Sequence, residues 1–239
     1  MTVDVVAIGA HPDDVELTIG GTVAKLVDRG KRVVIIDMTR GEMGTRGTPE
    51  RRAEEAQEAA RTLGAVERIC LDLGDGTVMD TIDSRVKVVE QLRRLRPTIV
   101  LANYWEDLHP DHNVCGQIVK NVMYTSGFKN FPAAGEPYRP NEFLFFMGHF
   151  PFEPSFVVDV SDYFETKRRA IECYQSQLHD PESDEPITQI ARPDFLLRIE
   201  ARARHFGSQI HTTYGEPLLA RRPVPMDDPV EHYRPFDKW

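Results

Sequence analysis

Hydrophobic and polar residues follow a repeating pattern in the first half of the 239-residue chain. Short runs of β-branched and other apolar residues, typical of buried strands, alternate with longer segments that place apolar residues at helical spacing. Strands are predicted at residues 3–9, 32–37, 69–73 and 98–102, with helices after Gly21, from Thr48 to Gly64, from Asp83 to Pro97 and over residues 114–123. This alternation predicts an α/β fold with a Rossmann-like, mostly parallel sheet and helices on both faces.

Beyond residue 125 the pattern is less regular. After a loop rich in proline and glycine, strands are predicted at residues 143–147 and 156–160, and helices from Ser161 to about Gln177 and from Phe195 to Phe206. We expect these elements to form a smaller C-terminal strand and helix extension. The prolines that follow Gly215 exclude a regular helix there, so we expect a tail that lies on a surface or on a neighbouring subunit. The predicted division is a domain over residues 1–217 and a proline-rich tail over residues 218–239.

Polar residues stand where the first strand is followed by a helix, at the edge of an α/β sheet where active sites form. His11 and Asp14 are ligand types that suit zinc, and their three-residue offset around Pro12 lets both side chains converge on one point. Asp13 then remains as a candidate general base for water bound to the metal. The alternative interpretation is a capping turn, in which Asp13 or Asp14 accepts hydrogen bonds from the next helix.

A second cluster follows the strand at residues 98–102 and repeats the His-Pro-Asp sequence in His109, Pro110 and Asp111, with His112 next. Either His109 or His112 can complete the three protein ligands of a catalytic zinc, and the other is then free for acid chemistry. Two such turns at two strand ends favour one shared metal site over coincidence.

These residues resemble the paired motifs of the LmbE/PIG-L-type zinc deacetylases, which remove acetyl groups from N-acetylglucosamine conjugates. The resemblance is carried by His11-Pro12-Asp13-Asp14 with Glu16, and by the motif at residues 109–112. Residues 39–50 and 174–177 are similar to the branch that includes the bacillithiol-biosynthesis deacetylases. The resemblance extends from the first strand to about Pro217.

The resemblance assigns roles within the two motifs. It implies zinc ligands at His11, Asp14 and His112, and a general base at Asp13. It also implies that a protonated His109 stabilises the oxyanion, with Asp111 orienting His109 and favouring its charged form. Fe(II) and Co(II) accept the same ligands.

The substrate-binding residues are predicted in the glycine-rich loop after the second strand and in the helix that follows it. The loop offers Glu42 and Arg46 to a sugar pocket, and the resemblance favours Arg52 as the residue that holds a substrate hydroxyl or carboxylate. Solvated connectors and exposed salt bridges are the alternatives for these residues. His149 and His179 have no metal-ligand partner at close spacing and are expected only at the wall of the site.

The resemblance implies hydrolysis of the acetamide of an N-acetylglucosamine conjugate, with N-acetylglucosaminyl-malate of bacillithiol biosynthesis as the expected substrate. It also implies a homo-oligomer, by family a hexamer. The bacillithiol enzymes usually have arginine where this chain has Leu108, so we expect weak discrimination between malate-linked and neutral sugars unless Arg46, Arg52 or a residue of another subunit replaces that contact.

Two alternative functions are considered. An amidase that acts on thiol conjugates of the bacillithiol type shares the same zinc site. A non-enzymatic nucleotide-binding protein would use Asp37 at the second strand, but the first turn lacks Gly-x-Gly-x-x-Gly, and its two aspartates would repel a pyrophosphate.

Composition narrows the remaining choices. The formal net charge of −9 argues against binding to the nucleic-acid backbone, which requires a basic face. No apolar run approaches the roughly 20 residues of a membrane helix, and Asp4 stands where a signal peptide is basic or apolar, so we expect a cytoplasmic protein without membrane contacts. The three cysteines, Cys70, Cys115 and Cys173, are widely separated and expected to be reduced.

Overall fold

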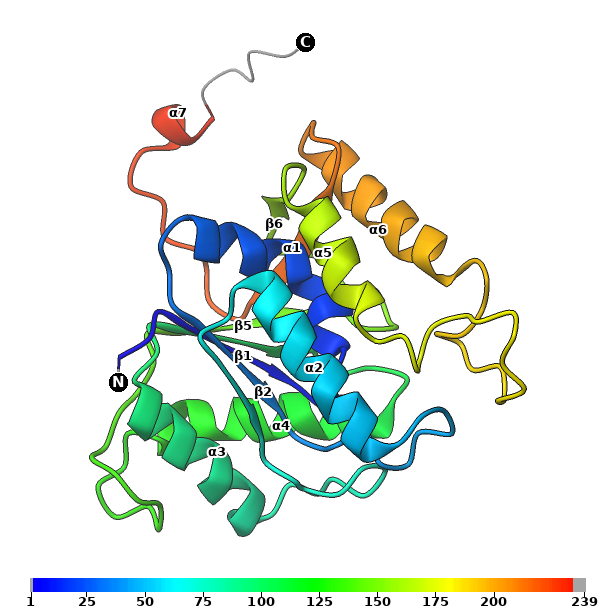
Figure 1. Ribbon diagram of the computed structural model, residues 1–239. Helices are drawn as coiled ribbons and strands as arrows, with labels where there is room; N and C mark the ends of the chain where they lie inside the picture. Colours follow the sequence, from blue (N-terminus) through cyan, green and yellow to red (C-terminus); the bar gives the residue numbers. More distant parts are fainter. Residues whose placement is uncertain (1, 234–239) are drawn as a thin grey trace.

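A seven-stranded sheet organises the structure, a computed structural model that describes residues 2–233 (Figure 1). Its order is β3-β2-β1-β4-β5-β7-β6. The strands are β1 (Val5–Gly9), β2 (Val33–Asp37), β3 (Glu67–Cys70), β4 (Ile99–Asn103), β5 (Glu142–Phe146), β6 (Phe156–Asp159) and β7 (Gly215–Ala220). The first five are parallel, and β7 pairs antiparallel with both β5 and β6. The predicted mostly parallel α/β sheet is therefore confirmed.

Helices cover both faces of the sheet, as predicted (Figure 1). One face packs against α3 (Ile82–Leu95) and α4 (Pro110–Thr125), and the other against α1 (Asp14–Asp28), α2 (Pro49–Leu63) and α5 (Phe164–Glu172). Helix α6 (Phe195–Gln209) contacts β7, and the short α7 (Pro229–His232) follows the sheet. Strands β1, β2 and β4 are almost fully buried because both of their faces are covered, which explains their continuous apolar sequences.

The strand order has its switch point at β1: the strands β2 and β3 that follow β1 in sequence lie on one side of it, and β4 lies on the other. Strand β2 lies on one side of β1 and β4 on the other, with Val5 opposite both Val33 and Ile99. In a parallel sheet the loops after two such strands leave from the same edge and diverge, which creates the crevice where ligands bind. The loops after β1 and β4 carry the two histidine motifs.

Helix α2 confirms the sequence prediction, whereas α1 differs from it. Helix α2 begins after Thr48, whose side chain accepts a hydrogen bond from the backbone N–H of Arg51, and it ends at Gly64 with φ of 78°. Helix α1 was predicted after Gly21 but begins at Asp14, and its path is broken at Ile19. The first turn of α1 faces the site and carries polar residues, so it lacks the apolar spacing that the prediction relied on.

The C-terminal extension also differs in detail from the prediction. The helix predicted from Ser161 to about Gln177 is the shorter α5, followed by tight turns in which the Ser176 N–H donates to Glu55 Oε1 at 2.8 Å. The predicted boundary between residues 217 and 218 lies inside β7, so the sheet continues to Ala220. Apolar pairing with β5 and β6 retains these residues in the sheet, because Leu218 lies opposite both Phe146 and Phe156.

None of the helices within residues 2–233 combines the length and the apolar character needed to cross a bilayer. Cys70, Cys115 and Cys173 form no disulfide within the described residues.

Candidate metal centre and active site

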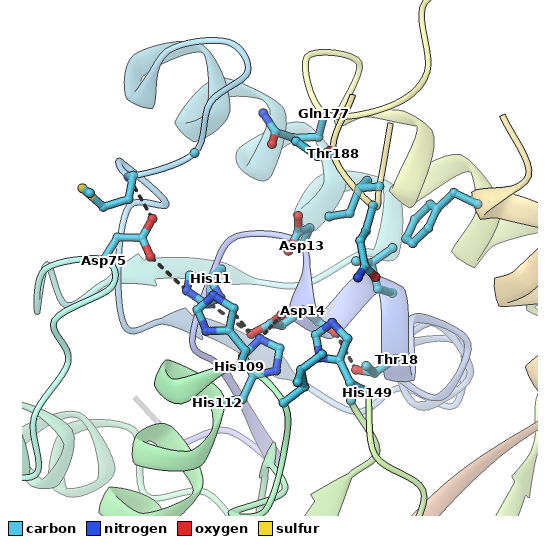
Figure 2. Close-up of a pocket in the computed structure, with 18 of the residues that line it drawn as sticks. His11, Asp13, Asp14, Thr18, Asp75, His109, His112, His149, Gln177 and Thr188 are labelled. Carbon is cyan, nitrogen blue, oxygen red and sulfur yellow. Dashed lines mark hydrogen bonds and ion pairs between the residues drawn. The ribbon is translucent and has the colours of Figure 1, made fainter. Parts of the chain in front are cut away.

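The loops after β1 and β4 bring three imidazoles together at the carboxyl edge of the sheet (Figure 2). His11 lies in the first loop, while His109 precedes α4 as its N-cap and His112 lies in the first turn of that helix. The ring centroid of His11 is 4.6 Å from that of His109 and 5.3 Å from that of His112. Two motifs that are about a hundred residues apart in sequence therefore form one cluster.

Asp14 lies between His11 and His112. Its Oδ1 atom is 3.1 Å from Nε2 of His112, and its Oδ2 atom is 3.8 Å from Nδ1 of His11. Oδ2 also accepts hydrogen bonds from the backbone N–H groups of Ala10 and His11, which fixes the orientation of the carboxylate. Burial alone would raise the pKa of Asp14, but the neighbouring histidines outweigh burial and hold that pKa well below its usual range. Asp14 is therefore ionised, as a metal ligand must be.

The other nitrogen of each of these two imidazoles contacts a further carboxylate. Nε2 of His11 lies 3.0 Å from Asp75 Oδ1 and 3.2 Å from Asp111 Oδ2. Nδ1 of His112 lies 3.0 Å from Asp107 Oδ1. Each ring thus directs one nitrogen toward Asp14 and the other toward a second carboxylate, which is how proteins commonly orient histidines that bind metal ions.

The charge balance of this cluster fits a divalent cation. Burial lowers the pKa of both imidazoles, but the surrounding carboxylates outweigh burial and raise the pKa of His11 to about 9 and that of His112 to about 10. The carboxylates therefore favour positive charge between the rings, and binding of a divalent ion would displace those protons. Ring nitrogens of His11, His109 and His112 approach within 4.8 Å of one another, and the Asp14 carboxylate also lies close to His11 and His112. Either Asp14 or His109 can therefore complete a set of three ligands with His11 and His112.

His109 is held differently from His11 and His112. Its Nδ1 atom accepts a hydrogen bond from the backbone N–H of Asp111 at 3.2 Å, so the neutral ring carries its proton on Nε2. Burial lowers the pKa of His109, and the nearby His11 and His112 lower it further. The carboxylate of Asp111 accepts a hydrogen bond from Gly76 N–H and contacts His11. Asp111 therefore contacts His109 through its backbone rather than through its carboxylate, and the lowered pKa of His109 favours the neutral ring over the protonated one that was expected.

Asp13 lies beside the cluster and is paired with a buried arginine. Its Oδ2 atom is 2.9 Å from Arg52 Nη2, which also donates to the backbone carbonyl of Pro12. Asp13 has φ of 113°, a conformation that costs energy for a residue with a side chain and persists only where neighbouring groups impose it. Burial raises the pKa of Asp13 to about 6, against the opposing charge of Arg52. Neither Asp13 nor Asp14 accepts a hydrogen bond from a backbone N–H of α1, so the capping interpretation does not describe this turn.

The cluster forms one end of a cavity of about 570 Å³. Asp13, Asp14, His109 and Arg52 line it together with apolar side chains. That apolar part of the wall comes from distant segments and includes Leu17, Leu108, Phe195 and Ile199. Figure 2 shows Asp13, Asp14 and the imidazoles facing a common space, with Gln177 and Thr188 across it.

The other two residues expected to bind substrate have structural contacts instead. The Glu42 carboxylate accepts hydrogen bonds from the backbone N–H groups of Arg40 and Asp75. The guanidinium of Arg46 is buried and donates to backbone carbonyls of the segment after α5, at Ser176, Leu178, Glu185 and Pro186. Arg46 therefore connects this segment to the glycine-rich loop, and of the three expected residues it is Arg52 that lines the cavity.

The sequence did not indicate two of the carboxylates that support the histidines, Asp75 and Asp107. Asp107 contacts His112 and also His149, whose Nδ1 atom lies 2.8 Å from Asp107 Oδ1 and whose ring stacks on His112. A Cβ atom at Gly148 would lie 2.3 Å from Asp107 Oδ2, so glycine is required for this approach. The position of Asp107 just before the second motif was its only sequence signal, whereas Asp75 and His149 come from loops whose spacing to the motifs indicates nothing.

Asp37, the residue that a nucleotide-binding function would need, is occupied. Arg68 Nε and Nη2 donate to its two carboxylate oxygens at 2.7 and 2.8 Å, and Arg68 also contacts Glu16. Asp37 is buried in this ion pair and is not available to a ribose hydroxyl.

Comparisons with known proteins identify the family of this chain. Residues 6–123 match the family model described as PIG-L, GlcNAc-PI de-N-acetylase. The diacetylchitobiose deacetylase of Thermococcus kodakarensis is 34% identical over 188 residues, which are 72% of this chain and 69% of that protein.

Solved structures extend the similarity to nearly the whole chain. A conserved protein from Thermus thermophilus is 35% identical with a TM-score of 0.86, over 95% of this chain and 98% of that one. The N,N'-diacetylchitobiose deacetylase from Pyrococcus horikoshii is 26% identical with a TM-score of 0.78, over 92% of this chain and 84% of that one. The chain therefore belongs to the PIG-L family of de-N-acetylases and is a hydrolase of that family.

Proposed function

We propose that this enzyme hydrolyses the acetamide of N-acetylglucosamine-type sugars and their conjugates, releasing acetate and the free amine. The observation that carries the proposal is the placement of Asp13 and His109 beside the cluster of His11, Asp14 and His112 at one end of a single cavity. The deacetylase names of the relatives from Thermococcus and Pyrococcus support the same substrate class.

In this proposal His11, Asp14 and His112 hold a zinc ion. Zinc bound there supplies a Lewis acid for the amide carbonyl and lowers the pKa of a coordinated water. The two imidazoles and the carboxylate match the three-ligand sets of catalytic zinc sites, and Fe(II) and Co(II) accept the same donors.

Asp13 acts as the general base. It lies next to Asp14, lines the cavity and is ionised above its pKa of about 6, so it can take a proton from the attacking water near neutral pH. The same carboxyl group then returns the proton to the leaving amine. Arg52 keeps the ionised form accessible despite burial, because its guanidinium is 2.9 Å away.

His109 stabilises the oxyanion as a neutral donor. Its Nδ1 atom is occupied by the Asp111 N–H, so Nε2 carries a proton that can be donated to a tetrahedral intermediate. The backbone contact at the amino end of α4 fixes the ring, and Asp111 in this scheme orients His109 through that N–H.

We further propose that N-acetylglucosaminyl-malate is a substrate but is preferred only weakly over neutral N-acetyl sugars. The cavity has two arginines, and both are engaged, Arg52 with Asp13 and Arg202 with the backbone carbonyls of Leu17 and Gly148. The exposed side chain of Leu108 stands at the cavity wall where a malate carboxylate would require a cation.

The test compares kcat/KM for N-acetylglucosaminyl-malate and for N-acetylglucosamine in the wild type and in Leu108→Arg. We expect similar values for both substrates in the wild type and a gain for the malate conjugate in the variant of roughly ten- to a hundredfold, the value of one charge-assisted contact. A strong wild-type preference for malate that Leu108→Arg does not change would show that other residues bind the carboxylate. Product identification with thiol conjugates tests the amidase alternative in the same assay.

The proposal also includes a cytoplasmic location, which the composition favours, and a homo-oligomer, which the family resemblance implies to be a hexamer. The mass of the purified enzyme in light scattering tests the second of these.

A further inference from the structure

Helix α1 is interrupted one turn after Asp14. In a regular helix the N–H groups of Gly21 and Thr22 donate to the carbonyls four residues earlier, at Leu17 and Thr18. Here Ile19 has φ of −124° and ψ of 21°, outside the helical region. The N–H of Gly21 donates to Glu216 Oε1 at 3.0 Å, and that of Thr22 donates to Glu216 Oε2 at 2.6 Å.

The carbonyls of Leu17 and Thr18, which precede the break, accept hydrogen bonds from side chains instead of from Gly21 and Thr22. The carbonyl of Thr18 accepts a hydrogen bond from Lys167 Nζ at 2.9 Å, and that of Leu17 accepts one from Arg202 Nη2 at 3.1 Å. One carboxylate and two cations thus occupy the places of two backbone hydrogen bonds. Glu216 comes from β7, Lys167 from α5 and Arg202 from α6, all from the C-terminal extension.

These three side chains, which we term the break network, are linked by charge, and Lys167 and Glu216 are shielded from water. Lys167 Nζ lies 2.6 Å from Glu216 Oε1, and the two side chains are 3% and 1% exposed. Removing one partner of such a pair leaves the other as an uncompensated buried charge. The network is therefore able to hold the break in one geometry.

Two consecutive glycines allow the network to approach the helix. A Cβ atom at Gly20 would lie 3.1 Å from Lys167 Cγ. A Cβ atom at Gly21 would lie 2.8 Å from Val160 Cβ and 3.1 Å from Glu216 Oε1. The small residues in the middle of α1, which the catalytic chemistry does not use, are thus explained by the approach of these side chains.

The break isolates a single helical turn that begins with Asp14. At its amino end the Asp14 carboxylate is bonded to the backbone of Ala10 and His11, and at its carboxyl end the carbonyls are bonded to Lys167 and Arg202. Arg202 also donates at 2.7 Å to the carbonyl of Gly148, the glycine that faces Asp107. The network therefore contacts both sides of the candidate metal centre without contributing a ligand.

We propose that Glu216, Lys167 and Arg202 are positioning residues that set the orientation of the first turn of α1 and thereby the affinity of the site for its metal ion. The proposal rests on the proposed metal binding by His11, Asp14 and His112. According to this proposal, the C-terminal extension influences metal binding although none of its residues is a metal ligand.

The decisive variant is Lys167→Met, which keeps the length of the side chain, removes the donor to Thr18 and does not alter the cavity wall. The zinc affinity of the folded protein is measured by competition with a chelator, and thermal unfolding of the metal-free protein is recorded in parallel. We expect affinity to fall about 10- to 100-fold, as for residues that orient metal ligands. The matched control is Lys25→Met, which removes a lysine of α1 that donates to the Asp159 carbonyl beyond the break, and it should bind zinc as the wild type does.

A second measurement requires no variant. If the break and the metal centre are coupled, zinc must slow amide hydrogen exchange at Gly21 and Thr22 in the wild type more than at residues 24–27 of the same helix, because coupling is reciprocal. Lys167→Met with reduced thermal stability but wild-type zinc affinity would overturn the positioning role, as would exchange at Gly21 and Thr22 that zinc leaves unchanged. A wild-type protein that binds no zinc would instead contradict the proposed metal site itself.

Discussion

The two halves of the chain reach the same cavity in different ways. In the first half, His11, Asp13 and Asp14 follow β1, and His109 and His112 follow β4, so the catalytic candidates stand on adjacent parallel strands. In the second half, the side chains that reach the site contact backbone groups or supporting carboxylates, as Arg202 does at Leu17 and Gly148. In the proposed mechanism the first half supplies the ligands and proton carriers, and side chains of the second half, together with carboxylates such as Asp107, hold them in place.

This difference has a chemical reason. A metal ligand or a general base must be one of a few residue types and must follow its strand at close spacing. A supporting group can bond to any carbonyl or N–H that lies within reach, and its distance along the chain is unrestricted. The comparison predicts that changes at the proposed ligands and general base abolish activity, while changes at supporting residues, in either half of the chain, alter affinity or stability.

The largest expected effect separates the two histidines of the second motif. His112→Ala should abolish metal retention, because only two of the three proposed ligands, His11 and Asp14, then remain. His109→Ala should retain the metal and lose about 10²–10³-fold in kcat, the cost of one oxyanion donor. Metal analysis of the purified variants, with kinetics, distinguishes them, and the reverse order would assign the ligand role to His109.

Asp13→Asn should lower kcat about 10²–10⁴-fold with the metal retained, because the amide cannot accept the proton of water. In the wild type the pKa of about 6 predicts that kcat/KM falls as the pH drops through that value, since protonation removes the base.

Arg52→Gln sharpens this test. The cation favours the ionised carboxylate, so its removal raises the pKa of Asp13 and shifts the acidic limb of the profile to higher pH. A profile whose acidic limb stays in place in Arg52→Gln would show that another group controls it.

Asp107→Asn should weaken zinc binding about 10- to 100-fold, because Asp107 orients His112 and the amide provides a weaker acceptor. Its carboxylate is also engaged by His149, and these contacts hold the pKa of Asp107 well below its usual range against the opposing effect of burial. Isothermal titration measures the effect. The control is Asp80→Asn, whose carboxylate pairs with Arg85 away from the cavity.

The smallest effect on chemistry is expected at Arg46. Arg46→Met should reduce the free energy of unfolding by about 1.5–3 kcal/mol through loss of charged hydrogen bonds, with zinc affinity unchanged. Urea unfolding checks this outcome. Wild-type stability combined with a raised KM would instead support the substrate-binding role that the resemblance implied.

The fold was largely predictable because, in the first half of the chain, local sequence signals agree with the helices and strands that form. The N-cap at Thr48 and the glycine at Gly64 define α2 from the sequence alone, and the apolar strands identify the parallel sheet. The insertion of β7 between β5 and β6 was not predictable, since β7 pairs with strands more than fifty residues away. The break in α1 was also hidden, because the glycines that permit it are explained only by Lys167 and Glu216.

The sequence by itself determined the α/β class and placed His11, Asp14, His109 and His112 directly after strands, because residue type and position relative to a strand are local properties. The tertiary structure alone decided which carboxylate supports each imidazole, that the Asp111 N–H donates to Nδ1 of His109, and that Arg46 holds a loop. It also decided that Lys167 and Glu216 replace backbone hydrogen bonds in α1. Such contacts depend on distances between segments far apart in the chain, and no spacing along the sequence encodes them.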